Sequence, residues 1–185
     1  MDDAVIVTSS LHDAQRVMDV LPKRFERFGL AIHPQKTRLV PFVHPWKSDG
    51  GGPGTFNFLG FTHHWGKTGK GGHAVMVKTA KDRFKRSLRR VYDWCQENRH
   101  RPVGEQCRML GRVIAGHCQY YGRTSNSRAL QRFRQGVLRV WFKWLQRRDQ
   151  KRSLKWEQFR NMVETMHRLP EALCVRSTLR PAANP

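Results

Sequence analysis

Hydrophobic and polar residues alternate with a helical period over the second part of the chain. From residue 80 to residue 170, apolar side chains recur every three or four positions, which predicts four amphipathic helices. Their breaks are expected at RHRPVG, at GRTSNS and near Ser153. The side chains expected on the buried faces are Phe84, Leu88, Val91, Tyr92 and Cys95 in the first helix, Leu110, Val113, Ile114, Cys118 and Tyr121 in the second, Leu130, Phe133, Val137, Trp141, Trp144 and Leu145 in the third, and Trp156, Phe159, Val163 and Met166 in the fourth.

The first part of the chain has shorter and less regular apolar runs. Residues 4–8, AVIVT, are largely β-branched and predict a strand. Ser10 offers a side-chain cap for a helix, which Pro22 is expected to kink and Gly29 to end. The following GLAIHPQKTRLVPFV predicts extended segments broken at Pro34.

Two further runs predict a β-hairpin. FNFLGFTHHW and HAVMVKT have the composition of strands, and the glycine-rich GKTGKGG joins them. Its GKT invites comparison with a phosphate-binding loop, but Phe61 stands where G-x-x-x-x-G-K-[ST] needs glycine. A strand rather than a helix follows, so we predict a hairpin turn and no nucleotide site. The preceding KSDGGGPGT is predicted to be a flexible loop.

The change of period near residue 80 predicts an α+β fold. We expect a β-rich piece at residues 1–79, a basic helical piece at 80–170 and a short flexible tail at 171–185. The four cysteines (Cys95, Cys107, Cys118 and Cys174) form no CxxC pair and are expected to be reduced and mostly buried. His117 and Cys118 have no second pair at ligand spacing, so zinc is not expected.

The charge of the chain changes this picture most. Lys and Arg number 35 against 14 Asp and Glu, a net charge of +21, which indicates a polyanionic partner such as RNA or DNA. An anionic membrane surface is the weaker alternative, and no apolar run approaches the roughly 20 residues of a membrane span. No signal peptide is visible, so a cytoplasmic location is expected.

The positive charge concentrates in the helical piece. Residues 98–152 carry 14 Lys and Arg against two acids, a local net charge of +12. Tyr120, Tyr121, Trp141 and Trp144 are interleaved there, and we expect these rings to be mainly core while the cations bind phosphates. Any one arginine would be an ordinary surface charge, so the hypothesis concerns the cluster. The candidate RNA contacts are Arg86, Arg89, Arg90, Arg108, Arg112, Arg123, Arg128, Arg132, Arg134, Lys143, Arg147 and Arg148.

A second candidate site lies at the start of the chain. Asp2 and Asp3 are adjacent carboxylates beside a predicted strand, and such pairs can hold divalent metals for phosphoryl transfer. A site of that kind needs a further carboxylate from a neighbouring strand. The alternative is that both side chains are simply solvated.

The order of motifs resembles that of group II intron reverse transcriptases/maturases, from the middle of the palm to the end of the thumb. MDD resembles the end of the Y-x-D-D hairpin, GLAIHPQKT the following motif with its Lys36–Thr37, and FLGF the strand near the primer. LGRVIAGHCQYYGRTSNSRALQRF and SLKWEQFRNMVETMHRLP resemble the helical thumb, or maturase-specific domain. The resemblance covers nearly the whole chain, in colinear order.

The resemblance implies roles for particular residues. Asp2 and Asp3 would hold Mg²⁺ in a complete palm, Lys36 could protonate the leaving pyrophosphate, and Phe58, Leu59, Gly60 and Phe61 would support the primer end. The fingers and first palm half, with the other metal-binding aspartate, have no counterpart here, so we expect the catalytic residues to be vestigial and no cofactor to be needed. The acids Asp13, Asp19 and Asp93 lack the required strand context.

Three functional hypotheses follow from these features. The first is an RNA-binding maturase-type fragment that helps a structured intron RNA fold and splice, without protein-catalysed chemistry. The second is part of an RNA-directed DNA polymerase, which would hold an RNA/DNA duplex once another chain or a longer gene product supplies the missing palm half. The third is a generic basic helical protein that binds DNA.

Overall fold

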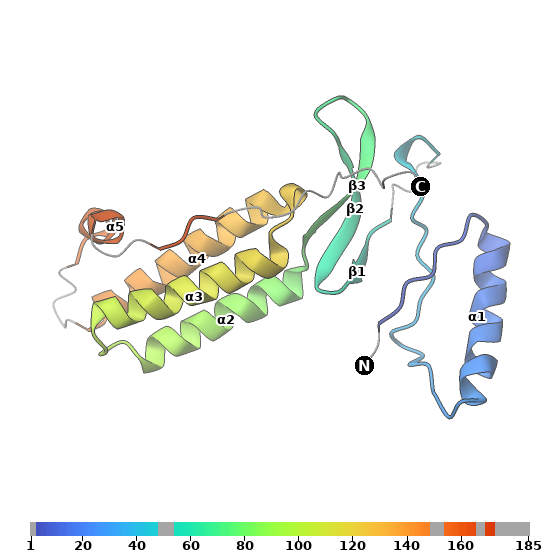
Figure 1. Ribbon diagram of the computed structural model, residues 1–185, viewed down its shortest axis with the longest axis horizontal. Coiled ribbons are helices and arrows are strands. Elements are labelled where there is room, and N and C mark those ends of the chain that lie inside the picture. Colours follow the sequence, from blue (N-terminus) through green and yellow to red (C-terminus); the bar gives the residue numbers. More distant parts are fainter. Residues whose placement is uncertain (1–2, 48–53, 149–153, 166–168, 173–185) are drawn as a thin grey trace. The chain divides into compact units, whose positions relative to one another are not determined.

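Helices and one small sheet make up the computed structural model of the chain, which describes residues 3–47, 54–148, 154–165 and 169–172 (Figure 1). The elements are α1 (Leu11–Glu26), η1 (Pro45–Lys47), β1 (Phe56–Phe58), β2 (Phe61–Lys67), β3 (His73–Thr79), α2 (Lys81–Glu97), α3 (Val103–Tyr121), η2 (Thr124–Asn126), α4 (Ser127–Gln146) and α5 (Trp156–Thr165), where η marks a short 3-10 helix. The strands form an antiparallel sheet in the order β1-β2-β3. The α+β class is therefore confirmed.

The chain divides into two compact units. The smaller unit comprises residues 1–59 and 64–74, and the larger comprises residues 60–63 and 75–185. Strands β2 and β3 contribute residues to both units. The separation at residue 79 that the sequence suggests stays a prediction.

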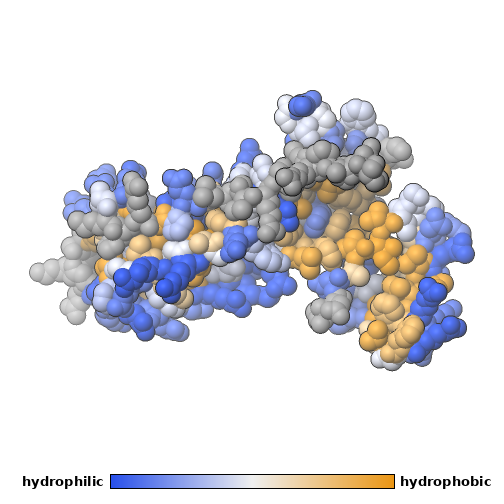
Figure 2. All heavy atoms as spheres, viewed as in Figure 1, coloured by the Kyte–Doolittle hydropathy of each residue, from blue (hydrophilic) through white to orange (hydrophobic). Residues whose placement is uncertain are grey.

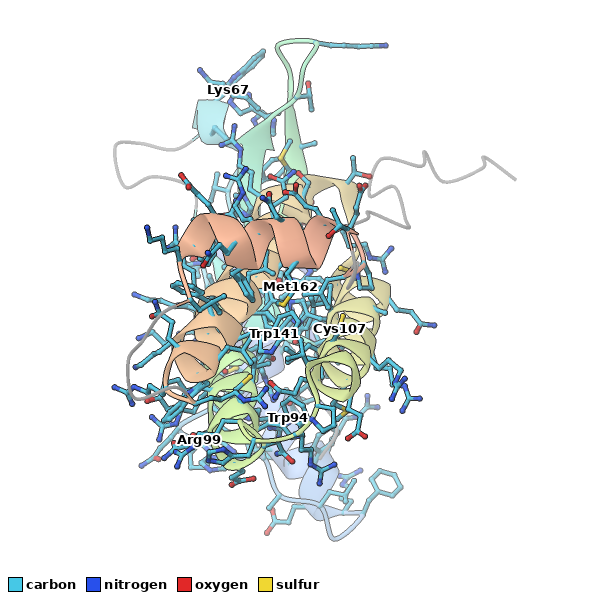
Figure 3. The ribbon with its side chains drawn as sticks, turned by 90° about the vertical axis from the view of Figure 1, so that its left-hand side faces the viewer. Lys67, Trp94, Arg99, Cys107, Trp141 and Met162 are labelled. Atoms are coloured by element: carbon cyan, nitrogen blue, oxygen red, sulfur yellow. The ribbon has the colours of Figure 1, made fainter. Side chains whose placement is uncertain are left out.

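Three long helices form the core of the larger unit. Helices α2 and α4 run parallel, because Phe84 contacts Phe133 in their first halves and Tyr92 contacts Trp144 near their ends, with ring centroids 6.0 and 5.3 Å apart. Helix α3 runs antiparallel to them, since His117 near its end stacks on Phe133 at 3.7 Å. Side chains from α3, α4 and α5 meet between these helices (Figure 3).

The buried faces predicted from the helical period are largely confirmed. All six side chains predicted for the third helix are buried in α4, and five of those predicted for α2 and α3 are half-buried against them. The fully buried ones outside α4 are Val91, Cys95, Leu110, Ile114, Cys118, Phe159 and Val163. The prediction for Trp156 is wrong: the residue is 38% exposed, although its ring contacts Phe142 at 4.9 Å. Met166 lies outside the described residues.

The predicted hairpin of β2 and β3 is confirmed, and Thr68 N donates to Gly72 O at 2.8 Å across its turn. The prediction of one continuous strand over FNFLGFTHHW is wrong, because Leu59 and Gly60 form a turn between β1 and β2. Their φ angles are +47° and +76°, and consecutive positive φ values are what a two-residue hairpin turn requires. Leu59 adopts this conformation at a cost of about 1–2 kcal/mol, which glycine would not incur.

The first helix is confirmed but the strand predicted before it is not. Ser10 caps α1 by accepting from His12 N at 3.2 Å, Pro22 lies within the helix, and Gly29 follows its last turn with φ +67°. Residues 4–8 form no strand, because a β-branched run makes a ladder only beside another strand and the described sheet consists of β1 to β3. Val7 is 86% exposed there.

Three of the four cysteines can be placed. Cys95, Cys107 and Cys118 are buried free thiols, as predicted, whereas Cys174 lies outside the described residues. The glycine-rich loop at 48–53 and the tail at 173–185 lie outside them as well. None of the described helices is both long and apolar enough to cross a membrane.

Candidate nucleic-acid interface

The basic residues singled out from the sequence lie mainly on α2 and α4. Arg86, Arg89 and Arg90 belong to α2, Arg108 and Arg112 to α3, and Arg128, Arg132, Arg134 and Lys143 to α4, while Arg123 precedes η2 and Arg147 and Arg148 follow α4. All are exposed except Arg123 and Arg134, which are half-buried. Hydrophilic side chains correspondingly cover much of the visible face of these helices (Figure 2).

Two aromatic rings organise the cations at the ends of α2 and α4. Lys143 Nζ lies 4.8 Å from the centroid of the Tyr92 ring and donates to Tyr92 Oη at 3.4 Å. Arg89 Cζ lies 5.4 Å from the same ring, and Arg89 Nε donates to Asp93 at 2.9 Å. Tyr92 is therefore contacted by one cation from its own helix and one from the parallel helix.

The second ring gathers cations in the same way. Arg147 Cζ lies 4.9 Å and Arg99 Cζ lies 5.9 Å from the Trp144 ring, which meets Tyr92 edge-on. We call these six residues the Tyr92–Trp144 cluster: Arg89, Tyr92, Arg99, Lys143, Trp144 and Arg147. Cation–π contacts hold the charged groups in place while leaving them in water, at about 0.5–1 kcal/mol each. Cations ordered in advance lose less side-chain entropy when a phosphate binds.

A buried glutamine fixes the turn that carries Arg99. Gln106 is 1% exposed, and its Nε2 donates to Arg99 O at 3.1 Å and to Arg101 O at 2.8 Å. Its Oε1 accepts from Trp141 Nε1 of α4 at 2.9 Å. The side chain thus joins the turn between α2 and α3 to the middle of the core, and Figure 3 shows Trp141 inside the bundle and Arg99 at its edge.

A second buried amide fixes the opposite end of the helices. Asn126 is 1% exposed; its Oδ1 accepts from Thr79 N at 2.8 Å, and its Nδ2 donates to Thr79 Oγ1 at 2.8 Å and to Tyr121 O at 2.9 Å. Ser125 Oγ accepts from Val77 N and donates to Val77 O. The connection between α3 and α4 is therefore bonded along the last residues of β3.

The buried polar side chains described in the larger unit, which are Thr79, Gln106, His117 and Asn126, carry no charge at neutral pH. Burial lowers the pKa of His117 to about 4, so its imidazole is uncharged at neutral pH. Burial also raises the pKa of Cys95 to about 12, so its thiol stays protonated. The positive charge available to a partner therefore lies on the helix surfaces and not among the core side chains.

The FLGF residues meet the tyrosine pair of α3. Phe61 stacks on Tyr120 at 6.0 Å with an interplanar angle of 11°, and it meets Tyr121 edge-on at 5.2 Å. Gly60 O accepts from Ala80 N at 2.9 Å, and a Cβ on Gly60 would lie 3.0 Å from Tyr121 Oη. Tyr120 is 58% exposed and is the exception to the expectation that the four interleaved rings are mainly core, since Trp141 and Trp144 are buried and Tyr121 is half-buried. Phe58 is half-buried in β1.

The residues assigned to catalysis by the resemblance are less organised. Lys36 is exposed in the turn at 34–36, and Asp3 is exposed outside any helix or strand. Asp2 lies outside the described residues. Among the described residues, no three His, Cys, Asp or Glu side chains lie together in a way that could hold a metal ion.

Two comparisons of the sequence with known proteins found no match. No protein-family model matches the chain, and no curated protein matches it significantly.

Sequence reasoning missed three members of the Tyr92–Trp144 cluster as functional candidates. Arg99 falls in RHRPVG, a predicted break between helices, and Tyr92 and Trp144 have the spacing of core residues. None of the three carries a local signal, because their roles depend on α2 lying parallel to α4. Only the basic composition around residue 99 could have indicated the first of them.

Proposed function

We propose that this chain binds structured RNA through the exposed cations of α2 and α4, as a maturase-type part of a group II intron-encoded protein. In this proposal residues 80–170 correspond to the thumb or maturase domain and residues 1–79 to the end of a palm. The observation that supports it most strongly is the Tyr92–Trp144 cluster, where four cations from two parallel helices and a turn surround two rings.

The chemistry of this surface favours phosphate contacts over base reading. Its polar groups are ammonium and guanidinium donors, which match phosphate oxygens and carry little sequence information. Structured RNA presents closely spaced phosphates in fixed positions, and bound protein would stabilise the folded intron relative to its open forms. Assistance to splicing would then need no chemical step by the protein.

A salt titration with charge variants tests the proposal. Affinity for a folded group II intron RNA should fall steeply as salt rises, because bound phosphates release counterions. K143Q/R147Q removes two cluster cations and should weaken binding and reduce the slope of log K against log salt by about one per lost phosphate contact. The control R16Q/R24Q removes the same charge from exposed positions of α1 and should leave the slope unchanged.

Two results would contradict the proposal. One is a nearly flat salt dependence of the unmodified chain, and the other is identical behaviour of K143Q/R147Q and its control. A third measurement separates RNA from DNA binding: duplex DNA competing equally with intron RNA at matched salt would favour a generic basic DNA-binding protein. Splicing of the intron RNA at limiting Mg²⁺ with and without the chain then tests the maturase role.

A second candidate function, participation in an RNA-directed DNA polymerase, is favoured by the apolar surface of the smaller unit. No residue of α1 is buried, and Val5, Ile6 and Val7 are 43%, 56% and 86% exposed. Figure 2 shows hydrophobic residues gathered over this region, as expected where further protein packs. Mg²⁺-dependent primer extension by the 185-residue chain, lost in D2N/D3N, would support activity of the chain itself.

A further inference from the structure

A row of aromatic rings in the smaller unit ends at a highly exposed tryptophan. Phe42 stacks on Trp65 at 5.6 Å, Trp65 contacts His44 at 4.7 Å, and His44 contacts His73 at 5.6 Å. Trp46 ends the row, with its centroid 5.8 Å from His44 and 6.0 Å from His73. The other four rings are half-buried, whereas Trp46 is 80% exposed.

The indole of Trp46 makes edge-on contacts with two imidazoles and is otherwise exposed to solvent. Trp46 N donates to His44 Nδ1 at 3.4 Å, which fixes the backbone of η1. The two neighbouring imidazoles meet the indole at 87° and 82°, so neither lies parallel to it. Neither imidazole stacks on the flat face of the indole, so this face is available to another aromatic ring. A ring stacked parallel on Trp46 would remove apolar surface from water.

The composition of the smaller unit after α1 favours an anionic partner. Between residues 27 and 74 the sequence holds one carboxylate, Asp49, against six Lys and Arg. The bond from Thr68 N to Gly72 O sets the register of the hairpin, so Lys67 lies directly opposite His73. Directly opposed residues of an antiparallel pair lie on the same face of the sheet. A lysine thus lies on the face that carries His73 and Trp65, near the end of the aromatic row.

We propose that Trp46 stacks on an unpaired base of single-stranded RNA while Lys67 contacts a phosphate of the same strand. A flat ring beside cations is the usual means of binding single-stranded nucleic acid without sequence preference. Bases inside a duplex are already stacked and paired, so the site takes a loop, a bulge or a strand end. The site is made by the smaller unit, separately from the helical surface that binds structured RNA under the function proposed above.

Fluorescence anisotropy with two labelled probes tests this site. The first probe is an oligouridylate of about 12 nucleotides, and the second is an abasic ribose-phosphate strand of the same length. W46A should weaken binding of the oligouridylate about 5- to 150-fold and leave binding of the abasic strand unchanged. W46F should restore part of the affinity, and K67Q should weaken binding of both probes alike, because it removes charge and not stacking.

The outcomes are distinguishable from folding and from the function proposed above. Because Trp46 is largely exposed, W46A should keep the circular dichroism and thermal midpoint of the unmodified chain. Equal binding of the oligouridylate by W46A and the unmodified chain would overturn the inference. So would an equal loss for both probes, or self-association of the chain that W46A abolishes, since the ring would then serve a protein contact. K143Q/R147Q with folded intron RNA tests the helical surface independently.

Discussion

Replacing Gln106 by methionine tests whether a buried amide holds the basic turn at the end of the helices. Methionine has a similar length and no polar atoms, so Q106M removes three hydrogen bonds without leaving a large cavity. The bonds lost are those to Arg99 O, Arg101 O and Trp141 Nε1. Trp141 is fully buried, so water cannot replace its partner.

The expected loss of stability follows from these contacts. An indole N–H left unpaired in the core costs about 1–3 kcal/mol, and each of the two part-buried carbonyls loses a bond worth about 0.5–1 kcal/mol. The methionine side chain is more hydrophobic than the amide, so its burial offsets part of this loss in free energy. We therefore expect Q106M to lower the free energy of unfolding by about 2–4 kcal/mol, which shifts the thermal midpoint of a chain of this length by roughly 5–15 °C.

Urea denaturation followed by tryptophan fluorescence measures this loss. Gln119 lies exposed on the same helix, so Q119M is a matched control and should change stability by less than about 0.5 kcal/mol. At a temperature where Q106M is folded, its affinity for RNA should also fall relative to Q119M, because the Arg99 turn is no longer held. A loss of less than about 1 kcal/mol, or equal RNA affinity of the two variants, would refute the reasoning.

Four further predictions concern the connections between elements and the buried His117 of α3. N126D should lower the free energy of unfolding by about 3 kcal/mol, because a carboxylate cannot donate a hydrogen bond to Tyr121 O. This loss should become smaller in acid, where the carboxyl group gains a proton. The control N161D, at an exposed site of α5, should change stability little. L59N should raise the free energy of unfolding by about 0.5–1 kcal/mol by relieving positive φ. G60A should lower the free energy of unfolding by about 1–2 kcal/mol, because Gly60 has positive φ and its Cβ would crowd Tyr121. The control G116A, at a helical site with free space around it, should raise the free energy of unfolding by about 1 kcal/mol. The pKa of His117 is about 4 in the folded chain, below its ordinary 6.5, so the unfolded chain binds the proton first as the pH is lowered. The free energy of unfolding should therefore fall by up to about 1.4 kcal/mol for each unit of pH lost between these two values. Denaturation curves of H117F measured over the same pH range should lack this component.

The helical piece was predictable because its core follows a single period. In α4, Phe133, Val137 and Trp141 recur at intervals of four and all three are buried. The same period distinguishes two adjacent rings of α3, since Tyr121, predicted to face inward, is half-buried, whereas its neighbour Tyr120 is 58% exposed. The prediction that Trp156 is buried failed because this residue is the first of α5 and lies at the border of the core, whereas Phe159 and Val163 further along the helix are buried.

The strand predictions failed for a different reason. A β-branched run such as residues 4–8 specifies a preference, but a strand exists only where another strand supplies hydrogen bonds. Leu59 shows the opposite case, since an unfavourable residue adopts positive φ because β1 and β2 pair on either side of it. Both outcomes depend on contacts between segments, which a local pattern does not contain.

The candidate interface was predictable in composition and not in arrangement. The excess of arginine indicated a polyanionic partner, but the same charge spread evenly over a surface would bind any nucleic acid weakly and without preference. What distinguishes this chain is that polar residues with no charge of their own order its cations. Gln106 holds the turn that carries Arg99, and Tyr92 receives cations from two parallel helices. If these contacts define the interface, removing the uncharged Gln106 or Tyr92 should weaken RNA binding by more than net charge can account for.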